Sequence, residues 1–151
     1  MDRIGILAQL KGEKITTSPD STRALGTQLG KVSPPGSIIC LFGDLGSGKT
    51  TFIQGVASQI TGTPLEQINS PTFVYLNIYG TQEKVFHFDL YRLRDADAFM
   101  SMGFEEFLYA GGICCIEWSE RIEALLPSGC LHVRISHISE GQRKVQISLE
   151  D

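Results

Sequence analysis

A phosphate-binding motif constrains the fold of this chain more than any other feature. Residues 43–50 read Gly-Asp-Leu-Gly-Ser-Gly-Lys-Thr and match the pattern G-x-x-x-x-G-K-[S/T] at every fixed position. The glycines of such a loop let backbone N–H groups turn inward around an anion, because no Cβ blocks the approach. In this pattern Lys49 is expected to meet the β- and γ-phosphates of a nucleotide, and the Thr50 hydroxyl is expected to bind Mg²⁺.

The segments on both sides of the motif support this interpretation. Residues 37–42 form an apolar run of strand length, and residues 51–60 predict a helix whose N-terminus adds partial positive charge beneath the phosphates. The alternative is a glycine-rich turn that meets the pattern by chance, and the strand-to-helix context argues against it. The predicted nucleotide site comprises Gly43, Asp44, Leu45, Gly46, Ser47, Gly48, Lys49, Thr50 and Thr51.

Length and composition predict a single globular domain over residues 1–151, with 42% apolar and 20% charged residues. The formal net charge of −4 argues against broad electrostatic binding to nucleic acid. The first ten residues lack a secretory pattern, and no apolar run approaches the ~20 residues that span a bilayer. We therefore expect a cytoplasmic location and no membrane association.

The cysteines lack the C-x-x-C spacing of common zinc sites, and three of them lie in or beside apolar runs. Buried free thiols are the favoured interpretation, because cysteine packs as a small hydrophobic residue. A zinc site built from Cys130, His132 and His137 is the alternative, although it lacks the usual paired spacing. The cysteines are Cys40, Cys114, Cys115 and Cys130.

The remaining pattern predicts an α/β fold. A helix over residues 18–31 is expected to begin with Ser18 as N-cap and Pro19 at its first position. Further helices are predicted over residues 95–102, 104–109 and 119–126, the last capped by Ser119. Strands are predicted over residues 14–17, 72–79, 84–89, 113–116, 131–138 and 144–149. Two hairpins are expected, within a P-loop NTPase-like three-layer fold whose mixed sheet has the P-loop strand at its centre and helices on both faces.

A P-loop site needs an acidic residue at the end of a neighbouring strand to hold the metal. Glu117 follows residues 113–116, an apolar run typical of a buried parallel strand, and such strands deliver their carboxyl ends to the nucleotide crevice. Glu117 is therefore the favoured metal-linked carboxylate. Asp89 is expected to position water or to sense the γ-phosphate. An ordinary strand-end acid remains the alternative for each.

Several other residues leave two interpretations open. Thr72 is either a switch threonine that closes on the γ-phosphate and Mg²⁺ or the start of a strand. Trp118 either packs in the core or covers the nucleotide or a partner. His87 is interpreted as a strand-face residue with a satisfied hydrogen bond, not a catalytic base. Arg92 and Arg143 are candidates to supply a cation to transition-state charge.

Four segments in order make a specific resemblance: residues 43–52, 70–73, 87–93 and 116–120, which read GDLGSGKTTF, SPTF, HFDLYRL and IEWSE. Together they resemble the bacterial TsaE (YjeE) family, the small ATPases of tRNA threonylcarbamoyladenosine biosynthesis. The resemblance covers residues 22–143. It implies binding of ATP and ADP with Mg²⁺ and a low intrinsic rate of hydrolysis.

The resemblance also implies a partner, a TsaD–TsaB-type tRNA threonylcarbamoyltransferase complex that modifies the adenosine beside the anticodon of ANN-decoding tRNAs. Contact with tRNA is expected only through that complex. In the family, the residues that match Thr50 and Glu117 are metal-linked, and those that match Asp89 and Thr72 are functionally needed. Residues that match Glu120 and Arg143 lie near the nucleotide. Ser47 replaces the family's frequent Ala, with no expected consequence.

Two other functions are weighed against this one. A small-molecule kinase would need an acceptor pocket and an arginine-bearing lid, and none of Arg92, Arg94 and Arg121 lies in a glycine-flanked segment. A GTPase-like switch or regulatory binding module would show a guanine-reading N-K-x-D stretch, which the sequence lacks. The sequence favours an ATPase whose nucleotide cycle acts on another protein.

Overall fold

The structure is a computed structural model that describes residues 3–150. Residues 1, 2 and 151 of the predicted domain lie outside the described residues, and the extent of the domain stays a prediction. The α-helices are α1 Arg3–Leu10, α2 Pro19–Val32, α3 Lys49–Thr61 and α4 Ala96–Ser101. The 3-10 helices are η1 Leu65–Gln67, η2 Phe104–Tyr109 and η3 Ser119–Leu125. The strands are β1 Gly12–Thr16, β2 Ile38–Phe42, β3 Leu76–Tyr79, β4 Val85–Asp89, β5 Ile113–Glu117, β6 Leu131–Ser139 and β7 Gln142–Leu149.

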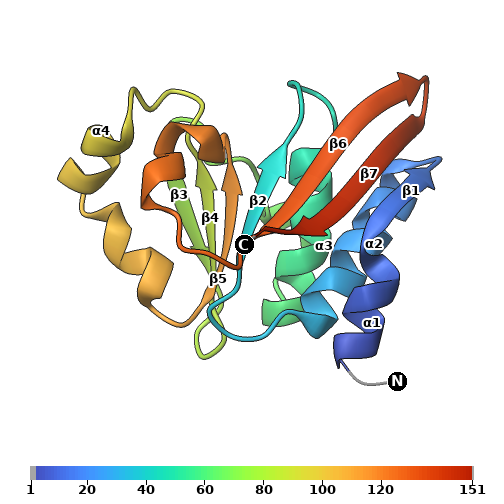
Figure 1. Ribbon diagram of the computed structural model, residues 1–151, viewed down its shortest axis with the longest axis horizontal. Coiled ribbons are helices and arrows are strands. Elements are labelled where there is room, and N and C mark those ends of the chain that lie inside the picture. The colour runs from blue at the N-terminus through green and yellow to red at the C-terminus, as the bar shows by residue number, and fades with distance from the viewer. Residues whose placement is uncertain (1–2, 151) are drawn as a thin grey trace.

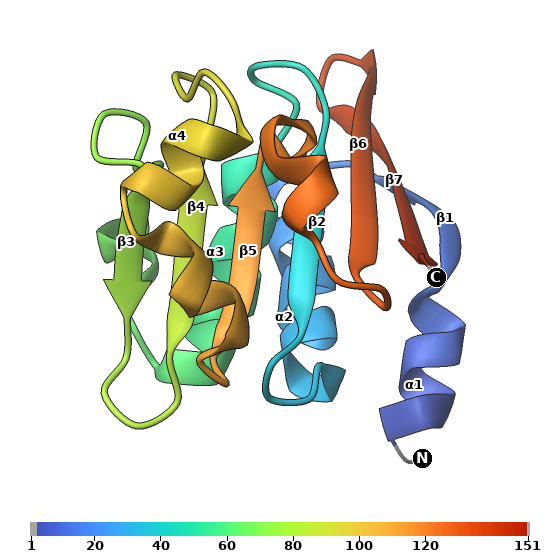
Figure 2. The same cartoon turned by 60° about the vertical axis from the view of Figure 1, so that its left-hand side comes forward.

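The strands form one seven-stranded sheet in the order β1-β7-β6-β2-β5-β4-β3, so the P-loop strand β2 is central (Figure 2). β2 runs parallel to both of its neighbours, β5 and β6, and β4 runs parallel to β5. The outer pairs β3–β4, β6–β7 and β1–β7 are antiparallel. The mixed sheet, its central strand and both predicted hairpins are therefore confirmed.

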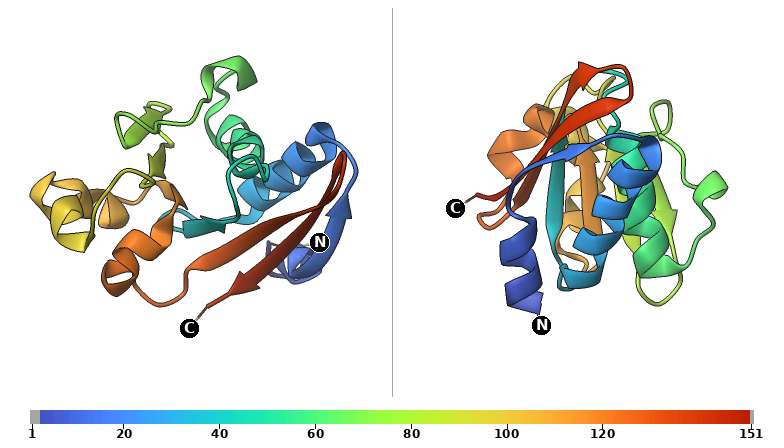
Figure 3. Two further views of the ribbon diagram at one scale, coloured as in Figure 1. Left: turned by 90° about the horizontal axis from the view of Figure 1, so that it is seen from above. Right: turned by 90° about the vertical axis from the view of Figure 1, so that its right-hand side faces the viewer.

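Helices cover both faces of this sheet, which confirms the three-layer prediction (Figure 1). Figure 3 shows α2 and α3 on one side of the sheet and η3 on the other. Because side chains alternate along a strand, β4 and β5 contribute side chains to two separate hydrophobic cores, one on each face of the sheet. Val85 and Ile113 pack in the core beneath α2 and α3 together with Phe52. Phe88 packs on the opposite face with Phe99 of α4.

Helix α2 begins as the sequence predicts. Ser18 is extended, and its Oγ accepts a hydrogen bond from the Ser21 N–H at 3.0 Å. The Ser21 hydroxyl in turn accepts from the Ser18 N–H at 3.1 Å, which completes a reciprocal cap. A cap of this kind stabilises a helix by about 1 kcal/mol.

The predicted strand over residues 72–79 is wrong in its first half, because β3 begins only at Leu76. The N–H groups of Val74 and Tyr75 both donate to the Pro71 carbonyl, at 3.1 Å and 2.6 Å. Tyr75 takes a left-handed φ of 69°. A turn led by Pro71 therefore outweighs the strand preference of the β-branched and aromatic residues that follow it.

Three further differences concern helices. Residues 119–125 form a 3-10 helix with a break at Ile122, where an α-helix from 119 to 126 was expected. The residue before it, Trp118, is left-handed at φ 63° and occupies the cap position, so the prediction of Ser119 as cap is wrong. Helix α1 was not predicted. Among residues 3–150, none of the helices combines the length and apolar character needed to cross a bilayer.

All four cysteines are buried and free, as predicted. Burial raises the pKa of the Cys114 thiol to about 12. The zinc alternative is wrong: Cys130 Sγ donates to the Pro127 carbonyl at 3.1 Å, and His132 Nδ1 lies 3.6 Å from a Glu150 carboxylate oxygen. The described residues contain no group of three or more His, Cys, Asp or Glu side chains that could hold a metal ion.

Helices α2 and α3 approach each other closely at Gly26 of α2 and Gly55 of α3. This contact generates a stability prediction. A Cβ on Gly55 would overlap the Arg23 carbonyl oxygen and lie 2.8 Å from the Thr27 backbone nitrogen. Gly55→Ala gains helix propensity of about 1 kcal/mol but must push the two backbones apart. We expect the free energy of unfolding to fall by about 2 kcal/mol or more in chemical denaturation.

The matched control is Gln59→Ala on the exposed part of the same helix. It should change the free energy of unfolding by less than about 0.5 kcal/mol. A Gly55→Ala variant as stable as the control would contradict the close approach of α2 and α3.

Candidate functional site

The loop from Gly43 to Gly48 joins the end of β2 to the start of α3 in a turn that depends on glycine. Gly43 has a φ of 147°, and a Cβ at this position would lie 2.5 Å from the Ile135 carbonyl oxygen and 2.6 Å from Ser47 Oγ. Gly48, at φ 113°, precedes α3 and brings no side chain to cap it. The first N–H groups of α3 therefore remain available to an anion, as the motif predicts.

Lys49 is folded back over this loop. It is only 5% exposed, and its Nζ donates to the Gly43 carbonyl oxygen at 2.6 Å. The same ammonium lies 4.5 Å from the centroid of the Trp118 ring. A carbonyl and an aromatic face thus hold one buried positive charge at the mouth of the loop. Thr50 and Thr51 follow in the first turn of α3 and are both half-buried.

Arg143 reaches the loop from β7, which lies on the other side of the P-loop strand β2 from β5 and β4, the strands of the two acidic residues. Its Nε donates to the Ser47 carbonyl oxygen at 2.9 Å. The Ser47 hydroxyl is buried without a partner among residues 3–150. The structure therefore brings Arg143 to the predicted site, although the contact is with the loop backbone.

The two candidate acids lie side by side. Asp89 and Glu117 are paired across the parallel strands β4 and β5, and they are 5% and 4% exposed. Both belong to the strand face that points toward α2 and α3, because Val85 and Ile113 on the same alternation pack there. β5 is the direct neighbour of β2, where Leu41 pairs with Glu117, whereas β4 lies one strand further away. Glu117 is the acid on the strand next to the P-loop strand.

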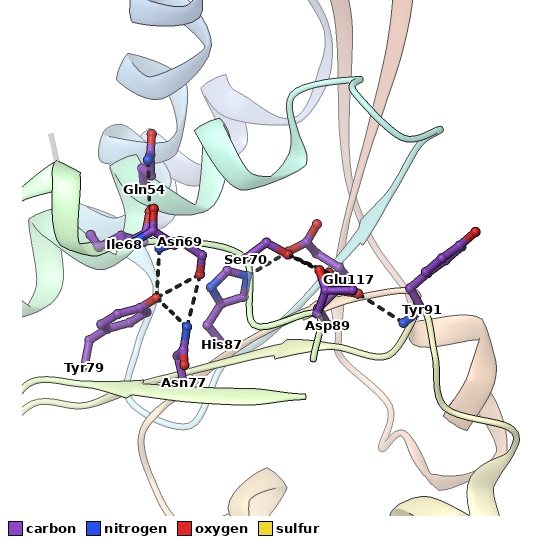
Figure 4. Close-up of polar contacts among 11 residues, drawn as sticks. Gln54, Ile68, Asn69, Ser70, Asn77, Tyr79, His87, Asp89, Tyr91 and Glu117 are labelled. Atoms are coloured by element: carbon purple, nitrogen blue, oxygen red, sulfur yellow. Dashed lines mark hydrogen bonds and ion pairs between the residues drawn. The ribbon is translucent and has the colours of Figure 1, made fainter. Parts of the chain in front are cut away.

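Asp89 is bound to the segment that carries Thr72 (Figure 4). Its Oδ2 accepts from Ser70 Oγ at 2.6 Å and from Thr72 Oγ1 at 3.0 Å. Its Oδ1 accepts from the Tyr91 N–H at 3.0 Å. Of the two interpretations of Thr72, the strand start is wrong. Its hydroxyl instead points to a buried carboxylate from a turn in which Phe73 and Val74 are exposed.

Glu117 has a different partner. His87 Nε2 lies 2.8 Å from Glu117 Oε2, and His87 is completely buried (Figure 4). The expectation that His87 has a satisfied hydrogen bond is confirmed for Nε2. The other ring nitrogen, Nδ1, is buried and has no partner among the described residues.

Trp118 packs against the core, as one of its two interpretations expects, and its role as a cover over the nucleotide or a partner stays a prediction. The half-buried ring packs against the core beneath α4 and lies 5.0 Å from the Tyr91 ring, while one face meets Lys49. Arg92 stacks 4.5 Å above the ring of Phe73, in the turn after Thr72, so it is placed on that turn and not beside Lys49.

Glu120 is exposed on η3. It lines a cleft of about 510 Å³ together with Phe42, the residue that immediately precedes the loop, and Arg134. Arg134 in turn lies 4.6 Å above the Phe42 ring. The predicted place of Glu120 near a nucleotide stays a prediction.

Sequence reasoning missed two residues of the site. It did not connect His87 with Glu117, although alternation places His87 on the same strand face as Asp89. It also missed Ser70, whose hydroxyl, two residues before that of Thr72, reaches the same carboxylate oxygen.

Comparison with known proteins agrees with this architecture. The family sequence model described as "Threonylcarbamoyl adenosine biosynthesis protein TsaE" matches residues 16–145. The chain is 34% identical over 134 residues to a Treponema pallidum protein, covering 89% of this chain and 98% of the relative. It is 39% identical over 134 residues to a Nostoc protein, covering 85% of this chain and 80% of the relative. Both relatives are named tRNA threonylcarbamoyladenosine biosynthesis protein TsaE.

A solved structure of YdiB from Bacillus subtilis superposes with a TM-score of 0.74 at 27% identity. The match covers 92% of this chain and 85% of YdiB, so the arrangement of the sheet and its helices is shared. The extent of the family match and the identity to these relatives show that the chain belongs to the TsaE family.

Proposed function

We propose that this chain is a Mg²⁺-dependent ATPase that supports the threonylcarbamoyl modification of adenosine next to the anticodon in ANN-decoding tRNAs. It acts through a partner complex of the TsaD–TsaB type. One observation carries the ATPase part: the P-loop joins β2 to α3, and the neighbouring parallel strand β5 ends in the buried carboxylate of Glu117. The names of the relatives support the pathway.

The chain's own groups support the proposed binding of ATP. The β- and γ-phosphates replace the Gly43 carbonyl as the partner of Lys49 Nζ, while loop N–H groups and the N-terminus of α3 surround the phosphate oxygens. Arg143 holds the Ser47 carbonyl oxygen of the same loop through its Nε. Trp118, against the same ammonium, limits the access of water to it.

The donor set also fits a Mg²⁺ ion, because a carboxylate and a hydroxyl are the hard oxygen ligands that this ion takes in proteins. Glu117 and Thr50 would hold it, Glu117 directly or through water. Bound Mg²⁺ would neutralise the charge that builds on the phosphate oxygens. Asp89, one strand further from the loop, is left to orient the attacking water or to respond to the γ-phosphate.

The switch is proposed from the bonds of Asp89. Thr72 and Ser70 share one oxygen of this carboxylate. A γ-phosphate that draws the Thr72 hydroxyl away would break one of these bonds and rearrange the turn. Phe73 and Val74 in that turn are 79% and 61% exposed, so a partner can read the change. Hydrolysis would restore the original bonds and reset the partner complex.

One feature favours this function over a small-molecule kinase. A cleft of about 840 Å³ opens at the opposite end of the parallel strands, where Ile113 begins β5 and Lys84 precedes β4, far along the strands from the P-loop. An acceptor bound in that cleft would not meet a γ-phosphate held at the carboxyl ends of the parallel strands. The net charge of −4 favours an RNA contact through the partner over a direct one.

Lys49→Ala tests the proposal in a reconstituted tRNA modification assay with the partner complex. Loss of a charge-assisted contact of about 1.5–3 kcal/mol should weaken ATP affinity by roughly 10- to 150-fold and abolish modification. Lys31→Ala is the control, because this exposed lysine lies at the end of α2, away from the loop. Phosphorylation of a metabolite, with no response to the partner complex, would overturn the proposal in favour of a kinase.

Glu117→Ala tests the metal assignment. ATP binding should be partly retained, the gain in affinity on adding Mg²⁺ should fall by about tenfold or more, and turnover should be abolished. Glu123→Ala, an exposed acid on η3, should leave all three quantities unchanged. Unchanged turnover in Glu117→Ala would move the metal role to Asp89.

A further inference from the structure

We infer that His87 is a positioning residue for Glu117: its Nε2–H fixes one carboxylate oxygen and thereby presents the other toward the P-loop metal. The inference rests on the proposed metal role of Glu117 and assigns a function to a buried histidine that the proposed ATPase cycle does not otherwise use. The contact itself joins His87 Nε2 to Glu117 Oε2 at 2.8 Å.

The fold gives this contact little freedom. His87 is the middle residue of the fully buried strand β4, with Asn77 of β3 on one side and Cys115 of β5 on the other. Since Cys115 is its direct neighbour, Glu117 is the diagonal partner on the same strand face. The Tyr79 ring lies 6.2 Å from the imidazole. A hydrogen bond from such a strand residue removes rotamer freedom that a glutamate side chain otherwise keeps.

The chemistry of imidazole suits a metal-linked carboxylate. The tautomer that donates from Nε2 bears no proton on Nδ1, and Nδ1 faces no partner among residues 3–150. Such a ring orients Glu117 without cancelling its negative charge. A Lys or Arg in the same place would form an ion pair and weaken the attraction of the carboxylate for a cation. Outer partners of this kind orient metal ligands in many sites.

The two acids are therefore held in different ways. Asp89 is bound by hydroxyls on the turn that contains Ser70 and Thr72, whereas Glu117 is bound by a side chain within the sheet. Hydroxyls on a surface turn can move away, but a completely buried strand residue cannot follow without opening the core. The fixed contact of His87 with Glu117 therefore suits metal binding, and the releasable contacts of Ser70 and Thr72 with Asp89 suit the switch.

The test compares two neutral amides at position 87. In His87→Gln the amide nitrogen of the new side chain is as many bonds from the backbone as imidazole Nε2. In His87→Asn the amide nitrogen is one bond closer to the backbone. For each variant, the dissociation constant of a non-hydrolysable ATP analogue is measured with EDTA and with Mg²⁺, and the ratio gives the gain due to the metal. Thermal melting is recorded for each sample. A His87→Asn protein without a cooperative melt is replaced by His87→Met, which fills the volume and lacks an N–H donor.

We expect affinities in EDTA to stay within about threefold of the parent, because neither variant touches the loop. The Mg²⁺ gain should fall about 10- to 100-fold in His87→Asn or His87→Met, and His87→Gln should restore it to within about threefold. An unchanged gain in the variants without a placed donor, whatever their melting temperature, would overturn the inference and leave a structural role only. Equal loss in His87→Gln would also overturn it.

The same measurement on Glu117→Ala separates this inference from the proposed function. A reduced Mg²⁺ gain in Glu117→Ala together with a normal gain in His87→Asn would overturn the positioning role of His87 and keep the metal role of Glu117. A normal gain in Glu117→Ala removes the metal role of that carboxylate, and the positioning role with it.

Discussion

The close backbone approach at Gly43 is the constraint on which the site depends. With no Cβ, the loop can pack against the Ile135 carbonyl of β6 and the Ser47 side chain, and its own carbonyl can accept from Lys49. Arg143 secures the same loop from β7. The parallel pairing of β2 with β5 and β6 then determines which residues surround the loop, because parallel strands deliver their carboxyl ends to one edge.

Adjacent positions on two strands give the two acids different surroundings. Glu117 lies beside the P-loop strand and is held from within the sheet, and Asp89 lies one strand away and is held by a surface turn. A buried carboxylate needs partners, and the nature of those partners decides what it can do. A partner buried in the sheet, such as His87, favours a function that does not change during the nucleotide cycle, such as metal binding. Partners on an exposed turn favour a task that changes with the nucleotide.

Much of this arrangement follows from local sequence. The P-loop, the cap at Ser18, the central strand and the acid at Glu117 each depend on residues close together in the chain, and the sequence predicts them. The turn after Pro71 could not be predicted, because strand preference and turn chemistry conflict there and the outcome depends on the bond to Asp89. The pairing of His87 with Glu117 also could not, since it requires the register between β4 and β5.

In the proposed switch, the nucleotide controls the turn at residues 70–75 through Asp89. Backbone amide hydrogen exchange of this turn, with Mg²⁺ and either ADP or a non-hydrolysable ATP analogue, tests it most directly. The account predicts that exchange rates differ by about tenfold or more between the two nucleotides, and that Asp89→Asn removes the difference. Identical exchange with both nucleotides, while the P-loop amides show that each is bound, would contradict it.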